Sequence, residues 1–234
     1  MFEKIEMAPP DPILGLSAAF KKDPNPDKIN LGVGVYINEE GVTPIFTAVK
    51  KAEERLVSRQ KSKGYLPIEG SPEYGRAVRE LAFGADHEIV TSGRAVSLHT
   101  PGGTAALRLA AEFLKTACPD TTIWVSDPTW ANHQAIFAAA GLPIKTYPYY
   151  NEATRALDFD AMIAALDKVP AGDTVLLHAC CHNPTGIDPT EEQWARIADT
   201  LAARGALALV DFAYQGFGLG LEKDAAGLRI LARP

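Results

Sequence analysis

The sequence is poor in several features that mark particular classes of protein. Its 234 residues include only three cysteines, Cys118, Cys180 and Cys181. An odd count with one adjacent pair is not typical of a disulfide framework, so it indicates a reducing compartment. No apolar run approaches the roughly 20 residues of a membrane-spanning helix. The first six residues carry two acids and no apolar segment, so they do not resemble a signal peptide. We therefore expect a cytoplasmic protein with no membrane partner.

Positive charge is also in short supply. The chain has 23 Lys and Arg against 29 Asp and Glu, a formal net charge of −6. Such a chain offers no basic face to nucleic acid, so we expect no nucleic-acid partner. The length suffices for one large or two small domains with a substantial core.

Complete nucleotide and metal motifs are missing as well. No lysine follows Gly102-Gly103-Thr104, and the glycine spacing fits neither a Walker loop nor a dinucleotide fingerprint. A Rossmann-type nucleotide binder is therefore disfavoured.

The segment from His178 to His182 holds two histidines and two cysteines. Adjacent cysteines rarely reach one ion together, and no second pair at ligand spacing exists, so we predict no metal site. We interpret His178 as a core or supporting histidine and the cysteines as small buried fillers.

From Arg94 onward, strand and helix patterns alternate. The predicted strands are 95–100, 122–126, 144–149, 174–179 and 206–210, and helical patterns lie between them. Such alternation predicts a mostly parallel sheet covered on both faces. Further helices are predicted from Thr43-Pro44 to residue 59 and after Ser71-Pro72 to residue 83. Residues up to about 28 read as an arm rather than as core.

Polar residues follow two of these strands. Asn183-Pro184 marks a tight turn after the strand 174–179, and its bond can be cis. Asp211 closes the strand 206–210, and Tyr214 lies three residues further on. In open α/β sheets ligands bind at this end of the strands. Asp211 is either a capping residue or a carboxylate that keeps a ring nitrogen protonated, as pyridoxal phosphate requires.

Two further stretches have both a structural and a functional interpretation. Gly102-Gly103-Thr104 lies before a helix, where backbone N–H groups bind phosphate, but it also makes a good tight turn. Trp130 begins a helix and is either a core aromatic or a ring stacked on a flat cofactor. His133, one turn on, supports Asp211 only if the fold brings the two together.

The order of these motifs resembles a known family. They are Asn30 to Tyr36, Tyr65-Leu66, Pro101 to Thr104, Trp130-x-x-His133, Cys180 to Gly186, and Asp211-x-x-Tyr214-Gln215-Gly216-Phe217. Together they resemble the pyridoxal-phosphate-dependent class I aminotransferases of fold type I, the bacterial aspartate and aromatic amino-acid enzymes above all. The resemblance covers essentially the whole chain.

The resemblance implies a set of cofactor-binding residues for pyridoxal 5′-phosphate. Gly102, Gly103 and Thr104 would hold the phosphate, and Trp130 would stack on the pyridine ring. Asp211 would pair with the ring nitrogen, with His133 behind it.

The remaining implied roles concern the ring oxygen, the substrate and a partner. Tyr214 and Asn183 would hydrogen-bond the 3′-oxygen. Asn183, Trp130 and Gly34 would contact the substrate. Tyr65 would reach the phosphate of the neighbouring subunit in a homodimer.

The resemblance also implies an architecture. Residues 1–45 would form an N-terminal arm and part of the small domain. Residues 46–234 would form an incomplete pyridoxal-phosphate-binding large domain, a three-layer α/β/α structure with a mostly parallel sheet. The family's Schiff-base lysine stands in a Ser-x-x-Lys segment a few dozen residues beyond the Asp-x-x-Tyr motif, and this sequence has only Lys223 after Asp211. Lys223 lies in a charged run and is interpreted as a solvated residue.

The expected function is transfer of an amino group between an L-amino acid, aspartate or aromatic, and a 2-oxo acid. We identify no catalytic residue, so we expect the chain to be C-terminally truncated and inactive alone. The alternative is a non-catalytic remnant that binds pyridoxal phosphate weakly or binds a partner subunit. The two substrate branches stay open, because the side-chain-binding arginine is not in this sequence.

Overall fold

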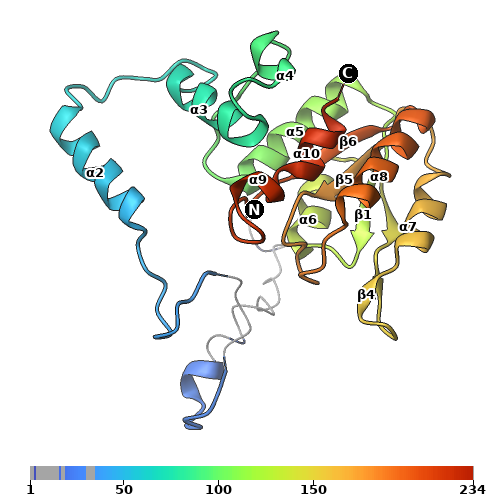
Figure 1. Ribbon diagram of the computed structural model, residues 1–234, viewed down its shortest axis with the longest axis horizontal. Helices are drawn as coiled ribbons and strands as arrows, with labels where there is room; N and C mark the ends of the chain where they lie inside the picture. The colour runs from blue at the N-terminus through green and yellow to red at the C-terminus, as the bar shows by residue number, and fades with distance from the viewer. Residues whose placement is uncertain (1–2, 4–15, 17–18, 30–34, 234) are drawn as a thin grey trace. The chain divides into compact units, whose positions relative to one another are not determined.

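The computed structural model describes residues 3, 16, 19–29 and 35–233 (Figure 1). The chain forms two compact units, Met1–Gly64 and Tyr65–Pro234. In the first unit, α2 (Thr47–Arg59) begins after Phe46, three residues later than the Thr43-Pro44 pair suggests, and none of its residues is buried. Gly34 and most of the predicted arm lie outside the described residues.

A four-stranded parallel sheet forms the centre of the second unit. Its strands are β1 (Ile123–Asp127), β2 (Ile144–Pro148), β5 (Thr174–His178) and β6 (Leu207–Asp211), in the order β2-β1-β5-β6. The predicted parallel sheet is thus confirmed. The polar stretch after β2 is a small antiparallel hairpin of β3 (Tyr150–Asn151) and β4 (Ala156–Leu157).

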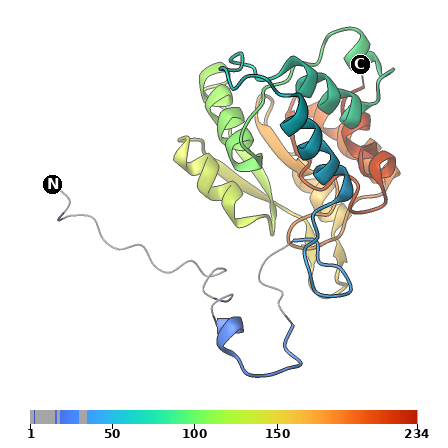
Figure 2. The same cartoon turned by 90° about the vertical axis from the view of Figure 1, so that its left-hand side faces the viewer.

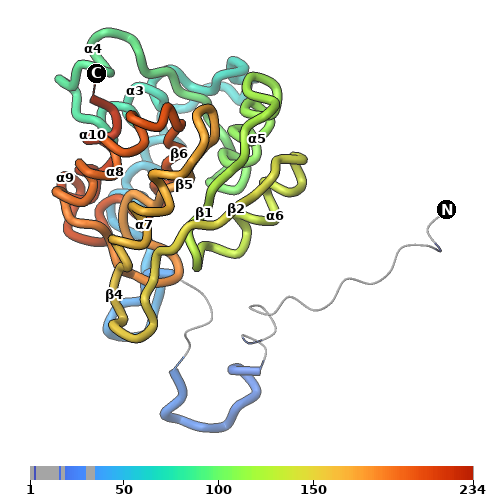
Figure 3. The backbone as a smooth tube through the Cα atoms, turned by 90° about the vertical axis from the view of Figure 1, so that its right-hand side faces the viewer, coloured from blue at the N-terminus to red at the C-terminus, as the bar shows by residue number. Residues whose placement is uncertain are grey.

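Helices cover both faces of the sheet (Figures 2 and 3). One face carries α5 (Gly103–Ala117) and α6 (Ala131–Ala139), and the other carries α7 (Phe159–Leu166), α8 (Glu191–Arg204) and α10 (Ala226–Leu231). A hydrophobic core lies on each side of the sheet, and the fully buried strand β5 contributes to both. Leu176 packs on the α5 and α6 side, and Val175 and Leu177 pack on the other. This division follows because alternate side chains of a strand point to opposite faces of the sheet. With helices packed on both faces, the predicted three-layer α/β/α arrangement is confirmed.

Local signals set the starts of two helices, of which the one at Ser71 was predicted. Ser71 caps α3 (Pro72–Phe83) by accepting a hydrogen bond from the Tyr74 N–H at 3.2 Å. Thr190 and Gln193 form the reciprocal capping box of α8. Two short helices, α9 (Leu221–Asp224) and α10, follow β6, and a short helix, α4 (Glu88–Thr91), was not predicted.

The predicted strand 95–100 was wrong. The segment has no regular secondary structure, and the N–H groups of Ala95 and His99 bond to the carbonyls of Ile89 in α4 and Glu69 in a loop. A strand requires a ladder with a neighbouring strand, and among the described residues this segment has none. Its apolar side chains are consequently left in solvent, with Val96 87% exposed and Leu98 56% exposed.

The strand order creates a place for a ligand. β2 lies on one side of β1, whereas β5 and β6 were added on the other side. The direction of winding therefore reverses between β1 and β5, and crevices form outside the carboxyl ends of strands at such a reversal.

Candidate functional site

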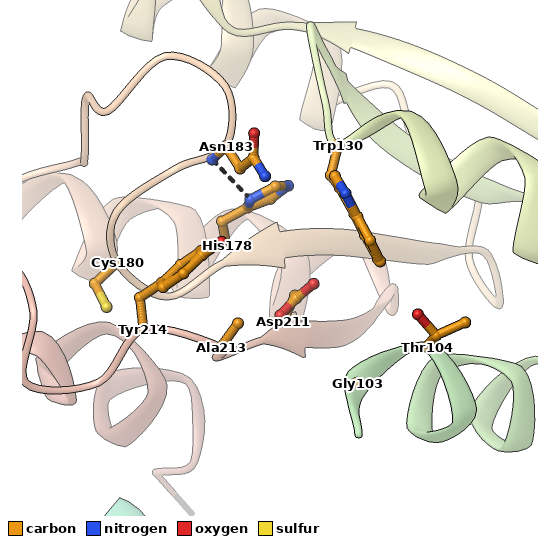
Figure 4. A pocket seen from close by; sticks show the side chains of 9 residues that line it. All are labelled: Gly103, Thr104, Trp130, His178, Cys180, Asn183, Asp211, Ala213 and Tyr214. Carbon is orange, nitrogen blue, oxygen red and sulfur yellow. Dashed lines mark hydrogen bonds between the residues drawn. The ribbon is translucent and has the colours of Figure 1, made fainter. Parts of the chain in front are cut away.

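A cavity of about 210 Å³ lies at the carboxyl ends of these strands (Figure 4). Its lining comes from the start of α5 and from the segments after β1, β5 and β6. The lining residues are Gly103, Thr104, Trp130, His178, Cys180, Asn183, Asp211, Ala213 and Tyr214.

One wall is the first turn of α5. Gly102 is the N-cap of this helix, with φ 86° and ψ 175°, a conformation that is essentially restricted to glycine. The 15-residue helix then begins at Gly103. Free N–H groups and the positive end of the helix dipole make this turn suited to an anion, and the Thr104 hydroxyl adds a polar group beside it.

Two aromatic side chains stand on opposite sides of the cavity, with Asp211 between them (Figure 4). Trp130 is the N-cap of α6, and its ring meets the His133 ring edge to face, at 5.2 Å and 89°. Tyr214 comes from the turn after β6. A flat ligand between these walls would have an aromatic face beside it and a carboxylate at one end.

Asp211 is held as a carboxylate. Burial alone would raise its pKa, but the hydrogen bond and the electrostatic interaction with His133 outweigh burial, so the pKa lies below its usual value. The His133 Nε2 to Asp211 Oδ2 distance is 3.0 Å. His133 is fully buried, whereas the Asp211 side chain is 21% exposed. The exposed part of this carboxylate is the part that faces the cavity.

A directed chain of hydrogen bonds fixes the tautomer of His133. The Asn183 backbone N–H donates to His178 Nδ1 at 3.3 Å, so this ring carries its proton on Nε2. His178 Nε2 lies 3.1 Å from Thr129 Oγ1, which lies 2.8 Å from His133 Nδ1. Each group therefore donates to the next, and His133 donates through Nε2 to Asp211. Burial lowers the pKa of His178 to about 4, which keeps its ring neutral near pH 7.

A second buried histidine supports this chain. The His182 ring stacks on Tyr149 at 3.8 Å and lies 4.2 Å from His178. Ser126 Oγ and Thr185 Oγ1 bond its two nitrogens at 2.9 and 2.8 Å. Burial lowers the pKa of His182 to about 3. The His182 ring is thus neutral, has a hydrogen-bond partner at each nitrogen, and packs against the His178 ring.

The turn that carries Asn183 is held by a carboxylate outside the cavity. Asp188 accepts hydrogen bonds from the N–H groups of Cys181 at 2.7 Å and His182 at 2.8 Å. Cys181 has a left-handed backbone with φ 50°, and the Asn183-Pro184 bond is cis. The side chain of Asn183 is thereby presented to the cavity from a fixed backbone (Figure 4).

The structure brings together six of the residues that the sequence singled out. Gly103, Thr104, Trp130, Asn183, Asp211 and Tyr214 line the cavity. Gly102 caps the adjoining helix, and His133 lies behind Asp211. Tyr65 is fully exposed and is not part of the lining.

Sequence reasoning missed four participants: Cys180 and Ala213 as lining residues, Thr129 as a relay, and His178 as a residue of the site. A signal for His178 exists, because it closes β5 as Asp211 closes β6, and the two are register partners. Thr129 stands four residues before His133, a spacing that places two side chains close together at the start of a helix.

The chain matches a known protein family. Residues 26–234 match the family model described as "Aminotransferase class I and II".

The chain belongs to this aminotransferase family. It is 53% identical over 232 residues to the aspartate aminotransferase of Salmonella typhi, covering 99% of this chain and 59% of that protein. The crystal structure of an aromatic amino acid aminotransferase from Burkholderia cenocepacia superposes with a TM-score of 0.96 at 52% identity, covering 100% of this chain and 58% of that one. The aromatic-amino-acid aminotransferase from Burkholderia pseudomallei, covalently bound to pyridoxal phosphate, gives 0.96 at 46% identity, with 99% and 58% covered.

The chain therefore spans slightly less than three fifths of the length of these relatives. No lysine is among the described residues that line the cavity, and Lys223 lies in α9 with its side chain exposed. Across the described residues, no helix is long and apolar enough to cross a bilayer, and no cluster of side chains suited to a metal ion is present.

Proposed function

We propose that this chain supplies the cofactor-binding part of a pyridoxal-phosphate-dependent aminotransferase. The whole protein would move an amino group between an L-amino acid, aspartate or aromatic, and a 2-oxo acid. The observation that carries the proposal is the Asp211–His133 pair, held between an aromatic wall and the N-terminus of α5.

The residues of the cavity fit the parts of pyridoxal phosphate one by one. The first turn of α5 suits the phosphate, because the N–H groups of Gly103 and Thr104 lie at the N-terminus of this helix and have no partner within it. Trp130 suits one face of the pyridine ring. Asp211, kept ionised, suits a protonated ring nitrogen. The Tyr214 hydroxyl and the Asn183 amide suit the 3′-oxygen.

When bound, the cofactor supplies an electron sink for the carbanion formed at the amino-acid Cα. Asp211 favours that role by keeping the ring nitrogen protonated. His133, whose tautomer is set by the chain from Asn183, keeps Asp211 an acceptor. Trp130 excludes water from one face, and Asn183 would orient the substrate carboxylate.

The assignment of domains and partners belongs to the same proposal. Residues 1–45 would be the arm and part of the small domain, and residues 46–234 the incomplete large domain. Exposure of Tyr65 suits a residue that reaches into a neighbouring subunit of a homodimer. The acidic chain and its few cysteines suit the cytoplasm.

Titration of the 234-residue polypeptide with pyridoxal phosphate tests the proposal. We expect saturable binding, seen as quenching of tryptophan fluorescence, that inorganic phosphate weakens by competition at α5. We expect no transamination of aspartate or an aromatic amino acid with 2-oxoglutarate, because no lysine among the described residues lines the cavity. Absence of saturable binding, or preference for a dinucleotide, would overturn the cofactor assignment.

A further inference from the structure

The Tyr214 hydroxyl makes no hydrogen bond to any residue that the structure describes, although its side chain lines the cavity. A phenol without a partner is positioned only by its own rotamer and by the backbone that carries it. The groups that fix the turn after β6 therefore decide where this hydroxyl lies.

That turn is fixed by one carboxylate. Asp224, at the end of α9, is 4% exposed and accepts three backbone N–H groups. Its Oδ2 accepts from Gly216 at 2.8 Å and Gly218 at 3.1 Å, and its Oδ1 accepts from Leu219 at 2.6 Å. Within the described part of the chain, Asp224 has no cation within ion-pair distance, so these N–H groups are what compensates its buried charge.

The contacts leave little freedom between Asp224 and Tyr214. The Gly216 N–H bonds Asp224 two residues after Tyr214, and the Phe217 N–H closes the turn on the Tyr214 carbonyl at 3.0 Å. Gln215 adds an outer anchor, because its side-chain amide donates to the carbonyls of Leu81 at 2.9 Å and Leu221 at 3.1 Å.

Gly218, whose N–H donates to Asp224, also lies close to the turn that carries Asn183. A Cβ on Gly218 would lie 2.9 Å from Asp224 Oδ1 and 3.3 Å from Cys181 Sγ. The turn after β6 is therefore packed directly against the turn that carries Asn183.

We propose that Asp224 is the positioning residue for Tyr214, acting through the N–H groups of Gly216, Gly218 and Leu219. The role rests on the proposed function for its chemical meaning, since the Tyr214 hydroxyl would donate to the 3′-oxygen of pyridoxal phosphate. Asp224 itself lies outside the cavity lining.

Asp224→Asn is the sharpest perturbation, because it preserves shape. One amide oxygen can accept at most two of the three N–H groups, and the new NH₂ must then face a donor. The matched control is Asp173→Asn. Asp173 is also a buried carboxylate, accepting from the Thr122 N–H at 3.0 Å and Trp124 Nε1 at 2.8 Å, but it precedes β5 at the opposite end of the strands.

The decisive measurement is a double-mutant cycle on the dissociation constant for pyridoxal phosphate. We expect Asp224→Asn to weaken binding about threefold to tenfold, which is the worth of one hydrogen bond. In a Tyr214→Phe background the same substitution should have no further effect. Asp173→Asn should leave the constant unchanged in both backgrounds. Equal weakening with and without the Tyr214 hydroxyl, or no weakening, would overturn the proposal.

A second variant and a second readout keep the test independent of folding and of the cofactor. Gly218→Ala disturbs the same carboxylate without removing its charge, and it replaces Asp224→Asn if that variant does not fold. It should weaken the binding of pyridoxal phosphate in the parent chain but not in the Tyr214→Phe background. The ring resonances of labelled tyrosine, assigned with Tyr214→Phe, should shift in Asp224→Asn and not in Asp173→Asn. If the parent chain fails to bind pyridoxal phosphate, the proposed function is wrong. If the Tyr214 resonance does not move in Asp224→Asn, the positioning role of Asp224 is refuted, whether or not the cofactor binds.

Discussion

Two buried, neutral histidines, His178 in the cavity lining and His182 packed against it, make stability depend on pH. Burial lowers the pKa of His178 to about 4 and that of His182 to about 3, whereas an unfolded histidine titrates at about 6.5. Below pH 6.5 these two histidines are protonated in the unfolded chain but stay neutral in the folded chain. Each histidine therefore contributes stability that is complete above pH 6.5 and is lost as the pH falls toward its folded pKa.

The size of the effect follows from these values. Each histidine lowers the free energy of unfolding by at most about 1.4 kcal/mol per pH unit within this window. Because the unfolded histidines are only half protonated at pH 6.5, the pair should remove about 3 kcal/mol between pH 6.5 and 5.0, a large fraction of the roughly 5–15 kcal/mol of a typical domain. Carboxylates contribute little here, because that range lies above the usual carboxyl pKa.

Urea unfolding at several pH values, followed by circular dichroism, measures this slope. We expect His178→Gln or His182→Gln to halve it, after allowance for the stability that each substitution itself removes. His99→Gln is the control, because the His99 ring is exposed and stacks only on Tyr74 at the surface. A free energy of unfolding that stays level from pH 7 to 5 would refute the assignment of neutral, buried rings.

Three further substitutions, with one control, test the site, its support and the packing of α10 on α8. Asp211→Asn removes the charge that pairs with the ring nitrogen, and titration should show binding of pyridoxal phosphate about 10- to 100-fold weaker; unchanged affinity would contradict the role. Thr129→Val leaves His178 Nε2 and His133 Nδ1 unpaired and should cost about 2–4 kcal/mol in urea unfolding. Thr121→Val, which breaks the buried Thr121–Thr174 bond at the other end of the strands, should also destabilise but leave cofactor affinity unaltered. Gly227→Ala places a Cβ 2.4 Å from the Trp194 ring between α10 and α8, so a loss of about 1–3 kcal/mol with a changed near-ultraviolet spectrum is expected, and a neutral outcome would contradict that packing.

The sequence predicted the layers well because the signals for them are local. Ser71 and Thr190 are caps whose partners lie within three residues, and the structure uses both. The apolar run of β5 is buried at every position, as the pattern of an interior parallel strand predicts. Polar residues at strand ends likewise indicated a ligand site before any contact was known.

What could not be predicted depends on neighbours that are distant in the chain. The segment 95–100 has strand composition, yet composition cannot supply the second edge of a ladder. Strand β6 shows the same limit: Leu207–Val210 reads as an interior strand, but none of its residues is buried, since among the described strands it pairs only with β5.

The histidine chain shows why the chemistry of the site needs coordinates. His133, His178 and Asp211 stand 33 to 78 positions apart, and only the register that pairs His178 with Asp211, together with the packing of α6, places Thr129 between the two rings. A shift of β6 by one residue would turn Asp211 to the opposite face of the sheet and leave His133 without its acceptor. The fixed backbone donor at Asn183 then determines every proton along the chain. The ionisation of Asp211 is thus a consequence of strand register as much as of the residues themselves.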